Sequence, residues 1–174
     1  MPVYAFDGKK PVIGKGTWIA PNAYVIGDVR IGDRCYIGFG AVIRGDFGRI
    51  EIGDECAIEE GVVIHGPTQT LIGNRVIAGH MAMIHNATIR DCALIGMQAM
   101  ICDNCVIGEW AIVAEKSMVL KNMTLPGKKI YRGIPAAEVA DLQQRHYDYL
   151  SFGQLAYVDL AEKYRESFER MDRL

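Results

Sequence analysis

Isoleucine and valine recur at every sixth position along most of the chain, and this spacing is the strongest regularity in the sequence. Gly, Asp and Asn fill many positions between these apolar anchors, as in IGDRCY, IGDECA and IGNRVI. The count restarts three times after steps of other lengths, and one anchor is an alanine. The anchors are Ile13, Ile19, Val25, Ile31, Ile37 and Ile43, then Ile52, Ile58 and Ile64, then Ile72, Ala78 and Ile84, and finally Ile89, Ile95, Ile101, Ile107, Val113 and Val119.

A period of six matches neither an α-helix nor a simple hairpin, and it predicts a parallel β-helix. A short strand that turns at a small residue and restarts every six residues winds into a three-sided coil of about eighteen residues. We therefore expect about six coils, stacked as parallel strands around an interior of Ile and Val. The alternative, a β-sandwich rich in β-branched residues, does not explain why so many anchors keep register.

Two longer steps interrupt the six-residue spacing and predict loops on the outside of the coil. Ile43 and Ile52 are nine residues apart, and the inserted segment contains RGDFGRIE. Ile64 and Ile72 are eight residues apart, with HGPTQTL between them. Loops on a rigid scaffold often carry function, so both insertions are candidates for the borders of a site.

The last part of the chain changes to a helical pattern. We expect one helix from 136 to about 149, a break at Gly153, and a second helix from about 154 to 171, packed along the β-helix. Residues 1–135 would form the β-helix, and residues 136–174 a helical extension of the same domain. The candidate inward side chains are those of Val139, Leu142, Tyr149, Leu155, Val158, Leu160, Ala161, Tyr164 and Phe168.

Composition excludes several functional classes. Half of the 174 residues are hydrophobic and the formal net charge is −2, which does not fit a disordered chain or a nucleic-acid-binding protein. The apolar runs are too short to span a membrane, and the first residues lack the pattern of a signal peptide. Five cysteines are too few for a disulfide scaffold, so we expect reduced thiols and a cytoplasmic location. Cys35, Cys56 and Cys105 occupy the small inward position of their repeats and are expected in the core.

Counting along the coils places two histidines on the same outer face. Because strand residues alternate between core and surface, the residue after each inward anchor points outward. His65 and His85 each follow such an anchor, and their anchors are one full coil apart. Stacked strands lie roughly 4.8 Å apart, so the two imidazoles could share a zinc ion with bonds of about 2.0–2.1 Å. Arg44 occupies the same column one coil earlier.

His80 belongs to the preceding side of the coil and should miss the ion that its own chain's pair binds. Five extended residues lead from it to His85, a span of roughly 16 Å before any corner shortens it. His80 could instead reach the pair of a neighbouring copy, if a head-to-tail interface closes at three subunits. A homotrimer is therefore a consequence of the metal hypothesis. The fourth histidine, His146, lies on the predicted terminal helix and is expected to be solvated.

Nearly the whole chain resembles the γ-class carbonic anhydrase-like proteins of the hexapeptide-repeat superfamily. The similar segments are AVIRGDFGRIEIGD, IEEGVVIHG, AGHMAMIHNATI, ALIGMQAMICDNCVIGEWAIVA and RGIPA. The resemblance implies an all-β fold, a left-handed parallel β-helix of hexapeptide repeats with a C-terminal α-helix packed alongside, in a homotrimer. It implies Zn2+ at each subunit interface, although Fe2+ or Co2+ also suit imidazole ligands. The implied metal ligands are His65, His80 and His85, and the implied interface ion pair is that of Arg44 with Asp46.

The activity implied by the resemblance is the reversible hydration of carbon dioxide to bicarbonate by a zinc-bound hydroxide. The chain departs from the family pattern at Glu59 and Glu60, where the family has Gln and Asp. Glu59 would accept a hydrogen bond from the hydroxide, and Glu60 would orient His80. Well-known active members also carry glutamates in the two loops as proton shuttles, whereas Phe47 follows the RGD segment here. We therefore do not expect a fast proton relay.

Two other functions remain open. Hexapeptide scaffolds also host acyltransferases and thioesterases that act on coenzyme A conjugates, and fold alone does not choose between these activities. The paired histidines in GHMAMIH argue against an acetyltransferase with a single catalytic base. The other alternative is a metal-binding structural trimer without turnover, which the missing loop glutamates favour. The expected partners are further copies of the chain and a small-molecule substrate, without nucleic acid or membrane.

Overall fold

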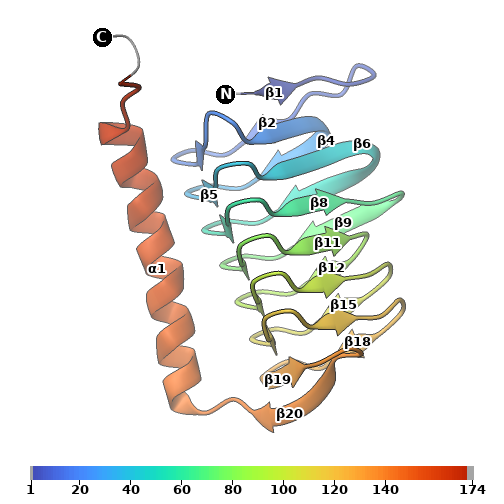
Figure 1. Ribbon diagram of the computed structural model, residues 1–174. Coiled ribbons are helices and arrows are strands. Elements are labelled where there is room, and N and C mark those ends of the chain that lie inside the picture. Colours follow the sequence, from blue (N-terminus) through green and yellow to red (C-terminus); the bar gives the residue numbers. More distant parts are fainter. Residues whose placement is uncertain (1, 172–174) are drawn as a thin grey trace.

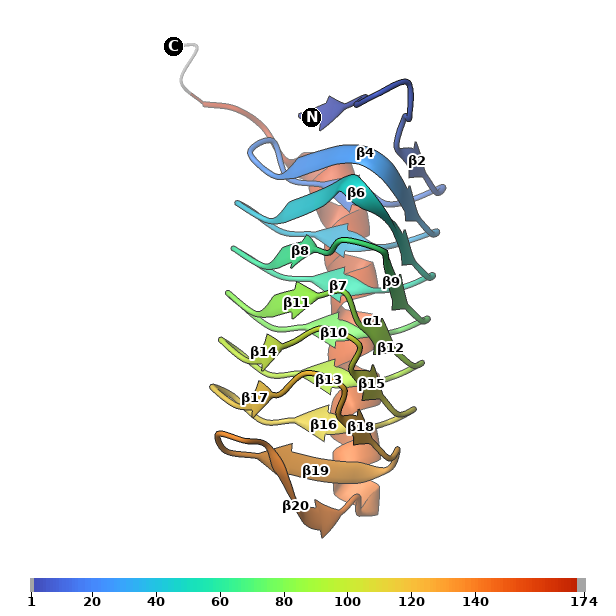
Figure 2. The same ribbon diagram turned by 90° about the vertical axis from the view of Figure 1, so that its right-hand side faces the viewer.

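Stacked three-sided coils make up most of the computed structural model, which describes residues 2–171 (Figure 1). One sheet contains eight strands, of which seven run parallel and the last, β20 (Ala137–Asp141), is antiparallel to its neighbour. The helix α1 (Gln144–Ser167) lies along the stack beside this sheet (Figure 2). The expected left-handed parallel β-helix with a C-terminal helix alongside is confirmed, with seven coils in place of about six.

The strands fall into three columns, one for each side of the coil. The first column, which faces α1, contains β3 (Trp18–Ile19), β5 (Tyr36–Ile37), β7 (Ala57–Ile58), β10 (Ile77–Ala78), β13 (Leu94–Ile95), β16 (Ile112–Val113), β19 (Lys129–Arg132) and β20. The second contains β8 (Val63–His65), β11 (Met83–His85), β14 (Met100–Ile101) and β17 (Met118–Val119). The third contains β9 (Gln69–Ile72), β12 (Thr88–Ile89), β15 (Val106–Ile107) and β18 (Thr124–Leu125). The longer strands β4 (Tyr24–Ile31) and β6 (Val42–Ile52) join the second and third columns, and β1 (Val3–Tyr4) and β2 (Val12–Ile13) pair with β4.

The anchors of the six-residue repeat line the interior, as predicted. In the second column, the fully buried isoleucines that pair from coil to coil are Ile43, Ile64, Ile84 and Ile101. Burying one such side chain contributes about 1.5–3 kcal/mol, so these stacks hold successive coils together. The thiols predicted to lie in the core are buried and unpaired, namely those of Cys35, Cys56 and Cys105.

The nine-residue step in the repeat forms an extended strand and not the expected loop. β6 runs without interruption from Val42 to Ile52 and pairs with β4 on one side. On its other side, the first half of β6 pairs with β8 and the second half with β9. These backbone hydrogen bonds keep residues 44–51 extended around the corner of the coil. The second insertion is a short connection, because β8 ends at His65 and β9 begins at Gln69.

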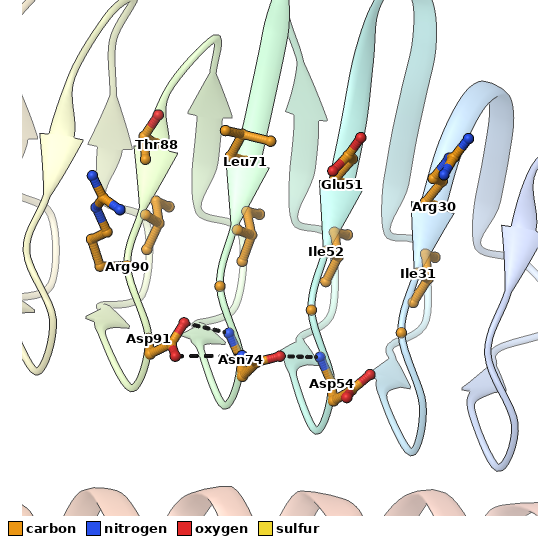
Figure 3. A pocket seen from close by; sticks show the side chains of 15 residues that line it. Arg30, Ile31, Glu51, Ile52, Asp54, Leu71, Asn74, Thr88, Arg90 and Asp91 are labelled. Atoms are coloured by element: carbon orange, nitrogen blue, oxygen red, sulfur yellow. Dashed lines mark hydrogen bonds between the residues drawn. The ribbon is translucent and has the colours of Figure 1, made fainter.

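Polar side chains tie successive coils together at the turns that follow the third column. The Asp54 N–H donates to Asn74 Oδ1, and the Asn74 N–H donates to Asp91 Oδ1, each at 2.9 Å (Figure 3). The Asp33 N–H donates in the same way to Asp54 Oδ1 at 2.8 Å. Each side chain thus satisfies a backbone donor of the preceding coil. The Asp and Asn positions between the anchors therefore have a structural role.

The segment after the last coil differs from the expected helix. Residues 137–141 form β20, which pairs with β19. Lys129 of β19 supports this pairing, because its Nζ lies 3.0 Å from Asp141 Oδ1 and also contacts Glu138. Val139 is consequently 47% exposed and is not an inward residue.

Within residues 2–171 a single helix, α1, replaces the two expected helices. It begins at Gln144, after a cap in which the Gln143 N–H donates to His146 Nδ1 at 2.8 Å. His146 is therefore a capping residue, which corrects the expectation that it is merely solvated. The helix packs against the first column, where the rings of Tyr164 and Trp18 stack with their centroids 4.3 Å apart. No helix among residues 2–171 is both long enough and apolar enough to cross a membrane.

The inward face of α1 agrees only in part with the prediction. Ala161 is buried, and Val158, Leu160 and Tyr164 are half-buried, as is Leu142 in the segment before the helix. Leu155 is exposed against expectation. Phe168 and Tyr149 are also exposed, but the Phe168 ring meets those of Trp18 and Phe39, and Tyr149 lines a hollow between α1 and the first column. The buried side chains of α1 are those of Leu150, Gln154 and Ala161, and Phe168 follows the last residue of the helix, Ser167. The rest of the predicted extension, residues 172–174, lies outside the described residues.

Gly153 lies inside α1 and does not break it. Replacing Gly153 with alanine should raise the free energy of unfolding by about 0.5–1 kcal/mol, because alanine has the higher helix propensity. A Cβ at this position would meet Ile77 Cδ1 at 3.4 Å, which is an ordinary contact. Urea denaturation of the two proteins measures the change, and a lower midpoint for Gly153→Ala would contradict the prediction.

Candidate metal centre

His65 and His85 lie side by side, as the column count predicted. They end β8 and β11, and the two strands pair in register with His65 opposite His85. The centroids of the two rings are 5.4 Å apart. Arg44 of β6 pairs with His65 from the preceding coil, which completes the predicted column. Each histidine follows a buried isoleucine, so a packed strand positions each ring.

A carboxylate contacts each of these imidazoles. Asp46 Oδ1 lies 3.2 Å from His65 Nε2. Asp103 Oδ1 lies 3.0 Å from His85 Nδ1, which leaves the Nε2 of that ring for another partner. Both contacts match the arrangement in which a carboxylate fixes the orientation of a metal-binding imidazole.

Asp46 is held in turn by an ion pair with Arg44 of the same chain. Burial acts to raise the pKa of the Asp46 carboxyl, but the hydrogen bond and the charge of Arg44 outweigh it and keep that pKa below its usual value. The predicted pair thus forms within one chain. Its role at a subunit interface stays a prediction.

Phe47 and Asn86 border the paired imidazoles. The Phe47 ring is 72% exposed and meets the His65 ring edge-on, with centroids 5.9 Å apart. Asn86 is buried directly after β11, and its Oδ1 accepts hydrogen bonds from the N–H and the hydroxyl of Thr68, at 3.2 and 2.6 Å. This anchors the short connection between β8 and β9 beside the histidines.

His80 lies in the turn after β10, and both of its ring nitrogens face carboxylates. Its Nε2 lies 3.1 Å from Glu59 Oε2, and its Nδ1 lies 2.8 Å from Glu60 Oε2. The His80 backbone N–H also donates to Glu59 Oε2, at 2.9 Å. Glu60 therefore makes the contact with His80 that the sequence predicted. The catalytic roles of Glu59 and Glu60 stay predictions.

Two tyrosines hold these carboxylates in place. The Tyr36 hydroxyl donates to Glu60 Oε1 at 2.6 Å, and burial together with this bond raises the pKa of the Tyr36 phenol. Burial, followed by a hydrogen bond with Glu59, likewise raises the pKa of the Tyr157 phenol on α1. Both phenols therefore stay protonated and act as donors. The helix is thus linked to His80 through Tyr157 and Glu59.

One chain alone does not bring the three histidines together around an ion. Among residues 2–171, no group of three His, Cys, Asp or Glu side chains is placed to hold a metal. The donors nevertheless fit zinc, because imidazoles backed by carboxylates are the usual arrangement around that ion. An ion bound by all three histidines would therefore need His80 from a second copy of the chain.

The hexapeptide pattern did not identify three residues that contact the candidate site, namely Asp103, Tyr36 and Tyr157. Asp103 is one position after Cys102, the residue that the column count places opposite His85, so the count gives only its neighbour. Tyr157 comes from α1, and the repeat carries no information about how that helix is placed. Tyr36 is buried, and nothing in the repeat distinguishes it from any other core aromatic residue until its contact with Glu60 is known.

A separate open groove of about 450 Å³ lies along the third column, away from these residues (Figure 3). Its walls carry charges of both signs, including Arg30, Glu51 and Arg90. None of the three histidines lines it. The groove therefore does not compete with the histidine cluster as the candidate site.

Known proteins show similarity over nearly the whole chain. Residues 10–45 match the family described as bacterial transferase hexapeptide (six repeats). The chain is 34% identical over 168 residues to the carnitine operon protein CaiE of Proteus sp. (strain LE138), which covers 95% of this chain and 85% of that protein. It is also 34% identical over 179 residues to the mitochondrial γ carbonic anhydrase 2 of Arabidopsis thaliana, and this match covers 96% of the chain. The solved structure of a hexapeptide transferase family protein from Anaplasma phagocytophilum superposes on this chain with a TM-score of 0.91 and 29% sequence identity. The superposition covers 94% of this chain and 98% of that protein.

These similarities agree with the repeat and with the stacked coils. The chain spans 64% of the length of the Arabidopsis protein, and the Proteus protein is matched over most of its length. The shared region includes the paired strands β8 and β11 that carry His65 and His85. This chain belongs to the γ-class carbonic anhydrase-like proteins of the hexapeptide-repeat superfamily.

Proposed function

We propose that this chain is a metal-dependent carbonic anhydrase-like enzyme that assembles as a homotrimer and hydrates carbon dioxide to bicarbonate. His65 and His85 of one copy and His80 of the next would hold a zinc ion at the interface. The in-register pair of His65 and His85 carries this proposal, because among residues 2–171 no third His, Cys, Asp or Glu joins the pair in a metal-binding group. Similarity to a γ carbonic anhydrase over 96% of the chain supports it.

The surface beside the paired histidines supports an interface with another copy. An apolar depression of about 270 Å³ adjoins His85 and is lined by Met83, Met100 and Cys102, among others. Met100 is 39% exposed in the single chain. Subunit interfaces are enriched in methionine and depleted of charge at their centre, so this face suits contact with a neighbouring copy.

A zinc ion held by three imidazoles lowers the pKa of a bound water to near 7 and so supplies a hydroxide for attack on carbon dioxide. Asp103 would orient the His85 ring by accepting a hydrogen bond from its Nδ1–H. Asp46 would act in the same way on His65, and the ion pair with Arg44 would hold Asp46 in place.

The two glutamates would have separate tasks at His80. Glu60, held by Tyr36, faces Nδ1 and would fix the orientation of the ring. Glu59 Oε2 lies beside Nε2 and would accept a hydrogen bond from the nucleophile. Because this chain has an acidic residue, Glu59, where the family has a neutral Gln, we expect slower hydration than in members with that Gln.

Proton transfer to bulk solvent is also expected to be slow. Phe47, next to His65, cannot exchange a proton, and the short connection at 66–68 has no acid. Turnover would then depend on buffer, because a dissolved base can replace a missing shuttle.

The proposed location is the cytoplasm.

Metal analysis combined with a stopped-flow hydration assay tests the proposal. We expect about one zinc ion per chain, together with carbon dioxide hydration that a chelator removes and added zinc restores. Stoichiometric metal without hydration would favour the structural trimer instead. Turnover of an acyl-coenzyme A that chelators do not affect would favour the acyltransferase, and either result would contradict the proposed enzyme.

A further inference from the structure

A second hollow lies beside His80, between α1 and the first column of strands. It has a volume of about 230 Å³. Ile77, Leu94 and Met97 contribute apolar surface from the β-helix, and Tyr149 and Tyr157 contribute rings from α1. Pockets for drug-sized ligands have volumes of roughly 300–1,000 Å³, so this cavity suits a smaller molecule.

The charged groups of the cavity are predominantly negative. The carboxylates of Glu59 and Glu115 line it, and no Lys or Arg is among its described lining residues. His80 also lines the cavity, and carboxylates face both of its ring nitrogens. An anionic ligand would therefore meet like charge, whereas a cation would be attracted.

The tyrosines add a second preference for a cation. Aromatic rings attract ammonium groups within about 6 Å of the ring centroid, and they recognise quaternary ammonium groups in particular. Tyr149 is 70% exposed and lines the cavity, so its ring is accessible to a ligand. The apolar surface from the β-helix suits the alkyl part of the same molecule.

We propose that this cavity binds a small organic cation, with its ammonium group between Glu115 and the tyrosine rings and its alkyl part against Met97 and Leu94. The cavity is formed by one chain, so this inference does not rest on the proposed metal chemistry. A cation at this position would lie next to His80.

Calorimetric titration of the purified oligomer with choline tests the inference. The matched control ligand is 3,3-dimethylbutan-1-ol, in which a carbon atom replaces the quaternary nitrogen, so shape is kept and charge is removed. We expect choline to bind about tenfold more tightly than this alcohol. Butyrate, an anion of similar size, should not bind. Equal binding of choline and the alcohol would overturn the proposal.

Two variants outside the proposed metal site locate the binding. Glu115→Gln and Tyr149→Leu should each weaken choline binding by about tenfold. Glu109→Gln is the control, because it removes the same charge from an exposed glutamate that lines a different depression. If Glu109→Gln weakened binding as much as Glu115→Gln, choline would be responding to net charge and not to the cavity.

The same titration separates this inference from the proposed function. Choline binding by a protein that contains no zinc would contradict only the metal proposal. Stoichiometric zinc and hydration activity without choline binding would contradict only the cation site. Circular dichroism spectra of the variants that match the unmodified protein exclude unfolding as the cause of lost binding.

Discussion

Replacing His80 with alanine should leave the purified protein almost without bound metal and without carbon dioxide hydration. Loss of a residue that merely orients a metal ligand typically costs 10–100-fold in metal affinity, and loss of a ligand should cost more. His80 is 41% exposed, so its removal creates no buried cavity and the coils should still fold. Metal analysis and the hydration assay measure the effect. Unchanged metal content in a folded oligomer would contradict the three-histidine site.

The same variant can test whether the site is shared between copies. His80→Ala chains retain the pair His65 and His85, whereas His85→Ala chains retain His80. In a closed ring of both chain types, the interface that joins the intact pair to the intact His80 regains a complete site. We therefore expect co-expression to restore metal to mixed trimers at about one of three interfaces, although neither variant alone binds it.

His146→Ala is the matched control for this experiment. It removes the same side chain from the same protein, but its imidazole caps α1 and lies outside the proposed site. We expect a loss of about 0.5–2 kcal/mol in stability, as for other helix caps, with unchanged metal content. If mixed oligomers of the two site variants bound no metal while each variant folded, the site would not lie between copies.

The second large effect is expected from Gly48→Ala in β6. A Cβ at this position would lie 1.8 Å from the backbone oxygen of Thr68 and 2.3 Å from its carbonyl carbon. Backbone atoms cannot rotate away as a flexible side chain can, so β6 and the 66–68 connection must separate. We expect a loss of about 3 kcal/mol in the free energy of unfolding, at the upper end of typical overpacking costs.

This substitution should also weaken metal binding. Asp46 and Phe47, the two residues before Gly48, both contact His65. A displaced β6 would therefore release the His65 ring from its carboxylate. Urea denaturation and metal analysis measure the two effects, with Gly153→Ala as the glycine control of opposite expected sign. A denaturation midpoint equal to that of the unmodified protein would show that the close approach of Gly48 to Thr68 is not required.

The periodic part of the fold could be predicted from the sequence because each coil repeats the same local interactions. Each anchor packs against the anchors one coil away, so a count of positions also predicts which residues stack. That count placed His65 beside His85, and Arg44 in the same column. The same reasoning fails at insertions, because a longer step can form a loop or a longer strand. At 44–51 the pairing of β6 with three other strands decided in favour of a strand.

The sequence by itself determined the stacked coils, the buried columns of isoleucine and the side-by-side histidines, because all three follow from a period of six. Only the tertiary structure decided the course of the chain after residue 135, where β20 and one continuous helix replace two helices. It also decided that Tyr157 of α1 meets Glu59 and that a cavity opens beside His80. The physical reason is that these contacts join elements far apart in the chain, and no repeat relates their positions.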